Sequence, residues 1–207
     1  MSSLHIEFIS DYICPWCYLG KVRLERVKQK LAGELELDIE VKPYVLYPHI
    51  TEAGEPKTNF AKKTKPGMGR SLKAEAAIEN ISFNYHLIER IPYSLNAHRL
   101  TWLIQDNVER YELSKLLFHS YFEEGKDIGN LEVLSEVIKK IGLSKKLIDQ
   151  LNTERTQQAV DAYLSELKSS FISVVPTLKL NHSVVINGLQ SEEIWEKYFV
   201  RASRMAV

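Results

Sequence analysis

The chain has 207 residues, of which 44% are hydrophobic and 26% are charged, so it can build a core of ordinary size without disulfide cross-links. Its 27 basic and 27 acidic residues balance, which disfavours a nucleic-acid partner because phosphate binding needs clustered positive charge. No stretch approaches the run of about 18 apolar residues typical of a transmembrane helix, so we expect no membrane partner. Residues 1–5 lack the features of a signal peptide, and we expect a cytoplasmic protein.

Hydrophobic periodicity predicts a strand, a helix and a second strand in the first part of the chain. Residues 4–8 alternate as in a strand, residues 20–31 have helical spacing, and residues 35–42 alternate again. This order is typical of a β-α-β unit with parallel strands. A connection rich in proline and glycine follows over residues 43–70, and its length indicates a functional or mobile segment.

Both cysteines of the chain lie in one tetrapeptide, Cys14-Pro15-Trp16-Cys17, at the junction of the first strand and helix. A helix N-terminus stabilises a thiolate through its unpaired N–H groups and its dipole, so Cys14 is the expected attacking thiol. Cys17 lies one turn further along on the same side and can release a mixed disulfide by attacking it. We expect Trp16 to be exposed beside Cys14, where Pro15 and Trp16 contact the substrate. The pattern predicts thiol–disulfide exchange.

A CxxC sequence can also be half of a zinc site, or two inert buried thiols. Structural zinc needs four ligands, commonly at paired spacings. The chain has no second CxxC and no pair of histidines at zinc-finger spacing among its six. We therefore predict a redox site with no metal, and with no cofactor beyond the disulfide that Cys14 and Cys17 form themselves.

Helical spacing dominates the middle of the chain, from residue 71 to residue 170. Asn96 and Asn130 are expected N-caps, and Gly142 is expected to end a helix. The predicted helices cover residues 72–91, 96–106, 113–121, 134–141, 144–151 and 160–167.

Strand character returns at residues 177–180 and 184–187, with Asn181 and His182 as the turn of a hairpin, before a last helix that begins at Ser191. The whole order is then β-α-β, a helical block and β-β-α. If the two ends of the chain close on each other, they form one small sheet with helices on its faces, and the helical block is an insertion.

Val175 and Pro176 come directly before the strand at residues 177–180. A proline can simply open a strand, because only one hydrogen-bond donor is lost. The other interpretation is a cis-proline loop that packs against the CxxC, with the Val175 backbone binding an extended substrate. The position of this loop, at the first strand after the helical block, favours the second interpretation.

Several segments together resemble one known family. They are SDYICPWCYLGK at residues 10–21, NAHRL at residues 96–100, YFEEGKDI at residues 121–128 and VPT at residues 175–177. In this combination the chain resembles the DsbA family, and more narrowly its FrnE-like branch, over nearly its whole length. The resemblance implies an α/β, thioredoxin-like fold with a large inserted all-helical domain. The sheet domain would comprise residues 1–50 plus 170–207, and the insertion residues 51–169.

The resemblance also implies roles for individual residues. Cys14 would be the attacking thiol, Cys17 the resolving thiol and Pro176 the cis-proline. The implied activity is that of a thiol–disulfide oxidoreductase, as a reductase or disulfide isomerase, on disulfides of proteins or small molecules, with a thiol reductant as partner. The chain departs from the family in having Ser173-Val174 where many members have a glycine, and it lacks the extra C-terminal cysteine pair of some FrnE-like proteins.

Two alternatives stay open. The kappa-class glutathione transferases and 2-hydroxychromene-2-carboxylate isomerases share the architecture, but they have serine at the first motif position and bind glutathione beside it. The chain could therefore be a glutathione-dependent transferase or isomerase, or a non-catalytic module that binds a peptide and senses redox state. His98 is expected either to pack inside the protein or to line the thiol cleft as a substrate contact. Asp11 is expected either to stabilise the turn before the helix or to tune the thiols.

Overall fold

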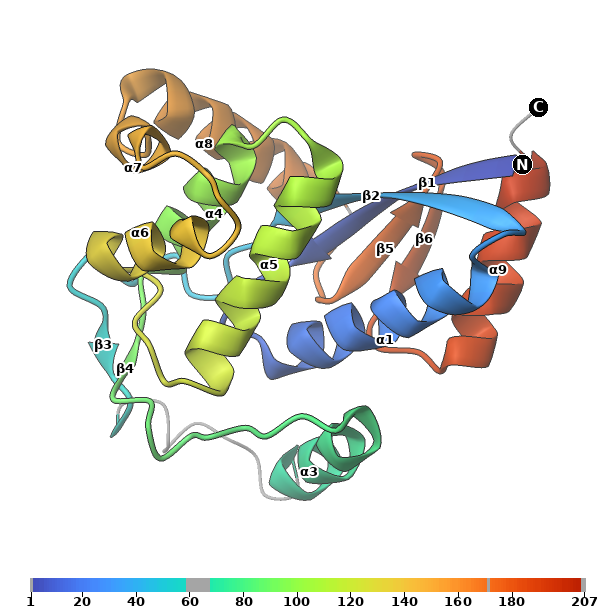
Figure 1. Ribbon diagram of the computed structural model, residues 1–207, viewed down its shortest axis with the longest axis horizontal. Coiled ribbons are helices and arrows are strands. Elements are labelled where there is room, and N and C mark those ends of the chain that lie inside the picture. Colours follow the sequence, from blue (N-terminus) through green and yellow to red (C-terminus); the bar gives the residue numbers. More distant parts are fainter. Residues whose placement is uncertain (1, 59–67, 171, 206–207) are drawn as a thin grey trace.

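The sheet lies beside a group of helices in this computed structural model, as Figure 1 shows. Its strands come from both ends of the chain, and α1 (Pro15–Leu31) and α9 (Glu192–Met205) pack against it. The helices of residues 94–169 gather at one end of the sheet, whereas the helix of residues 68–79 lies apart from them beside α1. The structure describes residues 2–58, 68–170 and 172–205.

Four strands form the sheet in the order β2-β1-β5-β6. They are β1 (Ser2–Ser10), β2 (Leu35–Pro43), β5 (Thr177–Leu180) and β6 (Val184–Asn187). β1 and β2 are parallel and connected through α1, whereas β5 and β6 are antiparallel to their neighbours. The predicted closure of the two chain ends into one sheet is confirmed.

Alternation along β1 divides its side chains between the two faces of the sheet. Leu4, Ile6 and Phe8 are fully buried and join residues of α1 and α9 in the main core. His5 and Glu7 therefore point to the opposite face. This second face is polar near the start of β1, and it lies at the far end of the strand from the cysteines.

The insertion consists of six helices and two short strands, counted within the described residues, and all of them fall between residues 51 and 169. They are β3 (Glu55–Pro56), α3 (Met68–Glu79), β4 (Arg90–Ile91), α4 (Ser94–Leu103), α5 (Asn107–Phe122), α6 (Leu131–Lys139), α7 (Lys146–Gln150) and α8 (Glu154–Ser169). Within the described part of the chain, no helix combines the length and apolar character needed to cross a bilayer. Residues 59–67 of the predicted long connection lie outside the described residues.

One core joins the sheet to the insertion. The ring of Tyr18 on α1 is stacked with those of Phe118 and Phe122 on α5, at centroid distances of 5.5 and 5.8 Å. The main hydrophobic cluster runs without interruption through both parts. The division into a sheet domain and an insertion domain therefore stays a prediction about folding units.

The predicted helix over residues 72–91 is wrong in its second half. α3 ends at Glu79 because Asn80 adopts a left-handed φ of 55°, and the Ile81 N–H turns back to the Ala76 carbonyl at 2.9 Å. Ile81 and Phe83 then pack against the core instead of continuing the helix. The apolar residues after Asn80 therefore have helical spacing because they are buried, although the backbone there is irregular.

Two local predictions also need correction. Asn96 is not an N-cap, because α4 begins at Ser94 and the Asn96 amide donates to the Gly129 carbonyl at 2.9 Å. The β5–β6 loop contains Ser183 in addition to Asn181 and His182, since the Ser183 N–H closes the turn onto Leu180. Asn130 and Gly142 are confirmed. The Asn130 side chain accepts from two N–H groups of α6, and Gly142 has a φ of +73° after that helix.

Ion pairs attach α3 to α1. The side chain of Glu79 is fully buried, and its carboxylate forms ion pairs with both Arg23 and Arg26. Arg23 also contacts Glu75, at 2.6 Å, and Arg26 extends to Glu192 of α9. A buried carboxylate has to be paired, so the position of α3 depends on the two arginines.

Lys21 of α1 is an unusual core residue. It is 1% exposed, and its ammonium lies over the ring of Tyr111 on α5. Burial lowers its pKa well below the ordinary value, although Glu25 and Glu112 oppose this shift. The protein therefore folds at a cost at any pH where a free lysine is charged.

We predict that Lys21→Met stabilises the protein, because methionine fills similar space with no charge to desolvate. The free energy of unfolding should rise by roughly 0.5–2 kcal/mol near pH 7. The lysine carries its full cost below its depressed folded-state pKa. That cost disappears as the pH rises toward the unfolded value of about 10.4. Denaturant unfolding should therefore show a larger gain near pH 7 than near pH 10.

Lys197→Met is the control, since Lys197 is an exposed lysine of α9. It should change stability little at either pH. Equal stability of Lys21→Met and the unmodified protein near pH 7 would contradict the assigned cost.

Candidate active site

The two cysteines lie where β1 passes into α1. Cys14 is the N-cap residue of α1, with Pro15 in the first turn, and its N–H donates to the Asp11 carbonyl at 3.0 Å. The N–H groups of Cys17 and Tyr18 in turn donate to the Cys14 carbonyl. The sulfur of Cys14 thus lies at the positive end of a 17-residue helix, as the sequence predicted.

The two thiols differ in their surroundings. Cys14 is 5% exposed, whereas Cys17 is fully buried behind it. Burial raises the pKa of Cys17 well above its ordinary value, and its hydrogen bond with Cys14 and the charge of Cys14 raise it further. Cys17 therefore keeps its proton at neutral pH and can share it with the outer sulfur.

The loop before β5 faces the outer thiol. The peptide bond between Val175 and Pro176 is cis, and the Cys14 sulfur lies 4.0 Å from the Val175 carbonyl oxygen. The Thr177 hydroxyl donates to the Val174 carbonyl at 2.8 Å, and the Gly188 N–H donates to the Pro176 carbonyl at 2.8 Å. The structure thus brings together two segments that are about 160 residues apart in the chain.

Gly20 is a site residue that the sequence analysis missed. A Cβ atom at this position would lie 3.1 Å from Cγ of Pro176, closer than side chains normally pack. Glycine therefore lets α1 approach the loop that carries Pro176. The available signal was a glycine inside a helix, where it costs roughly 1 kcal/mol relative to alanine and calls for a packing reason.

A buried carboxylate fixes the segment before the motif. Asp11 is fully buried and accepts hydrogen bonds from the N–H groups of Leu46, at 2.7 Å, and Ile13, at 3.3 Å. His98 Nε2 lies 3.3 Å from the same carboxylate. Asp11 thus connects the end of β1 with the segment after β2 and with α4. The hydrogen bond to the Ile13 N–H also stabilises the turn before α1, as expected.

The structure places the His98 side chain inside the protein. Its side chain is 2% exposed and its ring stacks on Tyr12 with centroids 4.7 Å apart. The Tyr12 hydroxyl is bonded to Thr101 at 2.7 Å, and burial raises its pKa. Of the two expected positions, the structure therefore shows the packed one, with the imidazole beside the buried carboxylate of Asp11.

Trp16 is partly buried, which corrects the expectation of an exposed indole. It packs against the small cluster formed by Leu19 of α1 with Leu72 and Ala76 of α3, and it also borders Leu189. The insertion helix α3 supplies the apolar surface, which the sequence of the motif could not reveal. Pro15 is half-buried beside it.

Tyrosines from two loops stand near Cys14. Burial and then the charge of Cys14 raise the pKa of Tyr47, and the same two causes raise the pKa of Tyr85 to about 12. Both side chains are partly exposed, at 36% and 40%. They extend the surface around the thiol with aromatic groups. The sequence analysis did not identify them, because loop tyrosines carry no positional pattern.

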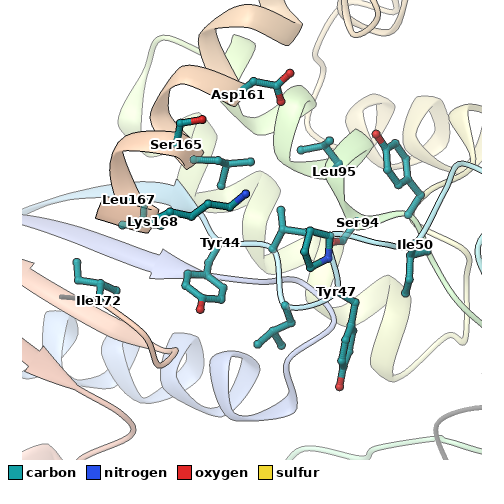
Figure 2. A pocket seen from close by; sticks show the side chains of 15 residues that line it. Tyr44, Tyr47, Ile50, Ser94, Leu95, Asp161, Ser165, Leu167, Lys168 and Ile172 are labelled. Atoms are coloured by element: carbon teal, nitrogen blue, oxygen red, sulfur yellow. The ribbon is translucent and has the colours of Figure 1, made fainter. Parts of the chain in front are cut away.

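A pocket of about 510 Å³ lies beside this surface, between the segment after β2, the start of α4 and the end of α8. Figure 2 shows Tyr44, Tyr47 and Lys168 around it, with the Lys168 side chain extending across its wall. Neither cysteine lines the pocket. It adjoins the thiol site through Tyr47 and through Ile172, which precedes the cis-proline loop.

These features can be compared with known proteins. A family model described as DSBA-like thioredoxin domain matches residues 5–200. The chain belongs to the DSBA-like thioredoxin domain family. The thioredoxin-like fold with a helical insertion, expected from the resemblance, is therefore confirmed. Members of this family are thiol–disulfide oxidoreductases. The narrower likeness to the FrnE-like branch stays a prediction.

Individual relatives of this DsbA-like chain are distant in sequence. The uncharacterised protein YwbO of Bacillus subtilis is 24% identical over 199 residues, which are 94% of this chain and 95% of YwbO. The probable DsbA oxidoreductase of Streptomyces coelicolor is 20% identical, with a TM-score of 0.83 over 99% of this chain and 92% of its own. The cytosolic disulfide reductase DsbM of Pseudomonas aeruginosa is 14% identical, with a TM-score of 0.68 over 98% of this chain and all of DsbM.

Two further structural matches bear on ligands. A second structure of DsbM contains GSH and matches with a TM-score of 0.61 at 14% identity, over 97% of this chain and 99% of its own. A 2-hydroxychromene-2-carboxylate isomerase matches with a TM-score of 0.70 at 16% identity, over 97% of each chain. At these identities the matches show a common fold.

We predict that Asp11→Asn destabilises the protein by about 1.5–3 kcal/mol, because it weakens charge-assisted hydrogen bonds and leaves a buried acceptor or donor mismatched. Thermal or denaturant unfolding measures the loss. Asp149→Asn, at an exposed position of α7, is the matched control and should stay within about 0.5 kcal/mol of the unmodified protein. If both variants have equal stability, Asp11 does not fix this site.

Proposed function

We propose that the protein catalyses thiol–disulfide exchange, with Cys14 as the nucleophile and Cys17 as the resolving thiol. One observation carries the proposal. Cys14 is the N-cap residue of α1, its sulfur lies 4.0 Å from the Val175 carbonyl oxygen, and Cys17 is fully buried one turn along the helix. The backbone beside Val175 can then align a substrate disulfide at Cys14, and the buried Cys17 provides the second thiol.

The reaction proceeds in two displacements. The Cys14 thiolate attacks one sulfur of the substrate disulfide, so that a mixed disulfide forms and the other substrate sulfur leaves as a thiolate. Cys17 then attacks the Cys14 sulfur, and its proton goes to the departing substrate sulfur. The substrate disulfide gains two electrons and becomes two thiols, and the protein loses the same two electrons as its Cys14–Cys17 disulfide forms. A thiol reductant returns the protein to the dithiol.

The compartment determines the direction of exchange. In a reducing compartment such as the cytoplasm the resting form of the protein is the dithiol. We therefore propose net reduction or isomerisation of substrates there. DsbM, which shares the fold, is a cytosolic disulfide reductase and has a structure with GSH, which supports glutathione as the thiol partner.

We predict that Cys14→Ser abolishes turnover in insulin reduction and in reactivation of scrambled substrate, because no other thiol faces the solvent side of the site. Cys17→Ser should still attack and should accumulate a mixed disulfide with the substrate, which mass spectrometry detects. Turnover by Cys14→Ser at the rate of the unmodified protein would exclude the mechanism.

The pocket beside Tyr47 is the proposed binding site for the part of a protein substrate next to its disulfide. Its wall combines aromatic and aliphatic side chains with the polar groups of Lys168, Asp161 and Ser165. Such a mixed wall suits a peptide, whose backbone and side chains need both kinds of contact. The pocket is separate from the thiols, so it can contribute affinity without taking part in the exchange.

We predict that Ser165→Phe, which fills the pocket from α8, raises KM for insulin by about tenfold, equivalent to ~1.4 kcal/mol of binding free energy. The rate with hydroxyethyl disulfide should not change, because this small substrate needs only the thiols. Ser169→Phe is the control, since Ser169 is an exposed serine of the same helix that does not line the pocket. Equal KM values for the two variants would rule out the pocket as a protein-binding site.

A second candidate function is supported by the similarity in fold to the 2-hydroxychromene-2-carboxylate isomerase. In that case glutathione would bind beside Cys14 and the thiol would not form disulfides. Isomerase or conjugation activity that survives Cys14→Ser, together with tight glutathione binding, would favour this function over exchange.

A further inference from the structure

A cluster of potential metal ligands lies at the far end of the sheet from the thiols. It consists of His5 and Glu7 on β1 and His182 in the loop between β5 and β6. One ring nitrogen of each histidine and one carboxylate oxygen of Glu7 lie within 4.8 Å of one another. Within the described residues, it is the one group of histidine, cysteine and acidic side chains this close together.

The backbone brings these three residues together. His5 and Glu7 are two positions apart on one strand, so they share the polar face of the sheet. Two hydrogen bonds attach the loop to that strand, from the Asn181 N–H to the His5 carbonyl at 2.9 Å and from the His5 N–H to the Asn181 side chain at 3.1 Å. His182 has a left-handed φ of 60°, and its Nδ1 reaches the Glu7 carboxylate at 2.7 Å.

His5 is arranged as metal-binding histidines usually are. Its Nδ1 lies 2.8 Å from the carboxylate of Asp38. An Nδ1–H of His5 can donate to this carboxylate, and the lone pair of the imidazole is then on Nε2. A carboxylate behind the imidazole orients the ring and makes it a better ligand.

The free nitrogen of His5 has no other use among the described residues. Nε2 is buried and makes no hydrogen bond there, and the carboxylate of Glu40 is too far for one, at 3.7 Å. A buried ring nitrogen with an unused lone pair is costly unless something binds it. This orphaned atom is the observation, independent of the clustering, that indicates a missing ligand.

Glu7 supplies negative charge that its surroundings neutralise incompletely. It is 7% exposed, and the parallel register places it next to Glu40 on β2. Glu40 has close cations in Lys42, at 2.8 Å, and Arg110, at 2.7 Å. Apart from His182, the cation nearest to Glu7 among the described residues is Lys179, whose Nζ is 3.5 Å from the carboxylate. A metal ion bound to Glu7 would displace this ammonium group.

We propose that His5 through Nε2, Glu7 and His182 bind one divalent first-row transition-metal ion, with Zn²⁺ as the representative ion. Two imidazoles and one carboxylate are a ligand set that suits such ions, and the remaining coordination positions face solvent because the His182 side chain is 68% exposed. Ligand atoms around one zinc ion lie within about 4 Å of each other. The most distant pair of these ligand atoms therefore has to approach by about 1 Å when the metal binds.

The test uses protein in which Cys14 and Cys17 are both changed to serine, so that the thiols cannot bind the metal. Calorimetric titration with Zn²⁺, and the visible spectrum with Co²⁺, should show one site per chain, and Zn²⁺ should raise the melting temperature. His182→Ala should weaken Zn²⁺ binding by at least about tenfold. His49→Ala, at an exposed histidine near Glu55, should bind as the parent does.

Two further variants separate the proposed site from a network of ion pairs. Asp38→Asn should weaken Zn²⁺ binding by roughly tenfold through its effect on His5. Lys179→Met removes the competing ammonium and should strengthen Zn²⁺ binding, whereas in a pure ion-pair network it would only destabilise the protein. Absence of Zn²⁺ binding to the parent, or equal affinities of the parent and His182→Ala, would overturn the proposal.

Discussion

The burial of one carboxylate, Asp11, is the constraint on which the thiol site depends. An ionised group fully removed from water has to be compensated by hydrogen bonds, and here the compensating donors come from three different segments. The N–H of Ile13 belongs to the turn before α1, the N–H of Leu46 to the segment after β2, and the imidazole of His98 to α4. The start of α1, and with it Cys14, can therefore take up only one position relative to the sheet and the insertion.

Helix α1 connects the two parts of the protein and carries the chemistry. Its buried face meets the sheet, Tyr18 stacks on α5, and Arg23 binds the carboxylates of α3. Gly20 allows contact with the cis-proline loop at the same time. A helix that is restrained on several sides has a rigid N-terminus. Helix N–H groups can stabilise a thiolate only if they keep fixed positions relative to it.

The insertion shapes the surface that a substrate meets. Tyr85 follows α3, and Leu72 on α3 helps to bury Trp16. The start of α4 and the end of α8 line the neighbouring pocket together with the segment after β2. These groups surround the thiol without taking part in exchange. In this architecture α1 of the sheet part carries both cysteines at its start, and the helices of the insertion form part of the surface around them.

Patterns that depend on neighbouring residues were predictable. The bounds of β5 and β6 matched their strand patterning, and Asn130 and Gly142 were identified at the ends of α6, because strand alternation and helix caps act over a few residues. The segment after Asn80 was not predictable. Its apolar side chains have helical spacing, but Ile81 and Phe83 find burial against the core without a helix, and burial depends on distant parts of the chain.

The sequence by itself determined that two sulfurs lie one turn apart at the start of a helix, because strand alternation precedes the CxxC and helical spacing follows it. Only the tertiary structure decided what surrounds them. It placed the Val175 carbonyl beside Cys14, turned His98 inward onto Asp11 and covered Trp16 with α3. It also gathered His5, Glu7 and His182 at the opposite end of the sheet. Such contacts join residues that are far apart in the chain, so they follow from packing and from the pairing of buried charges, which no local pattern encodes.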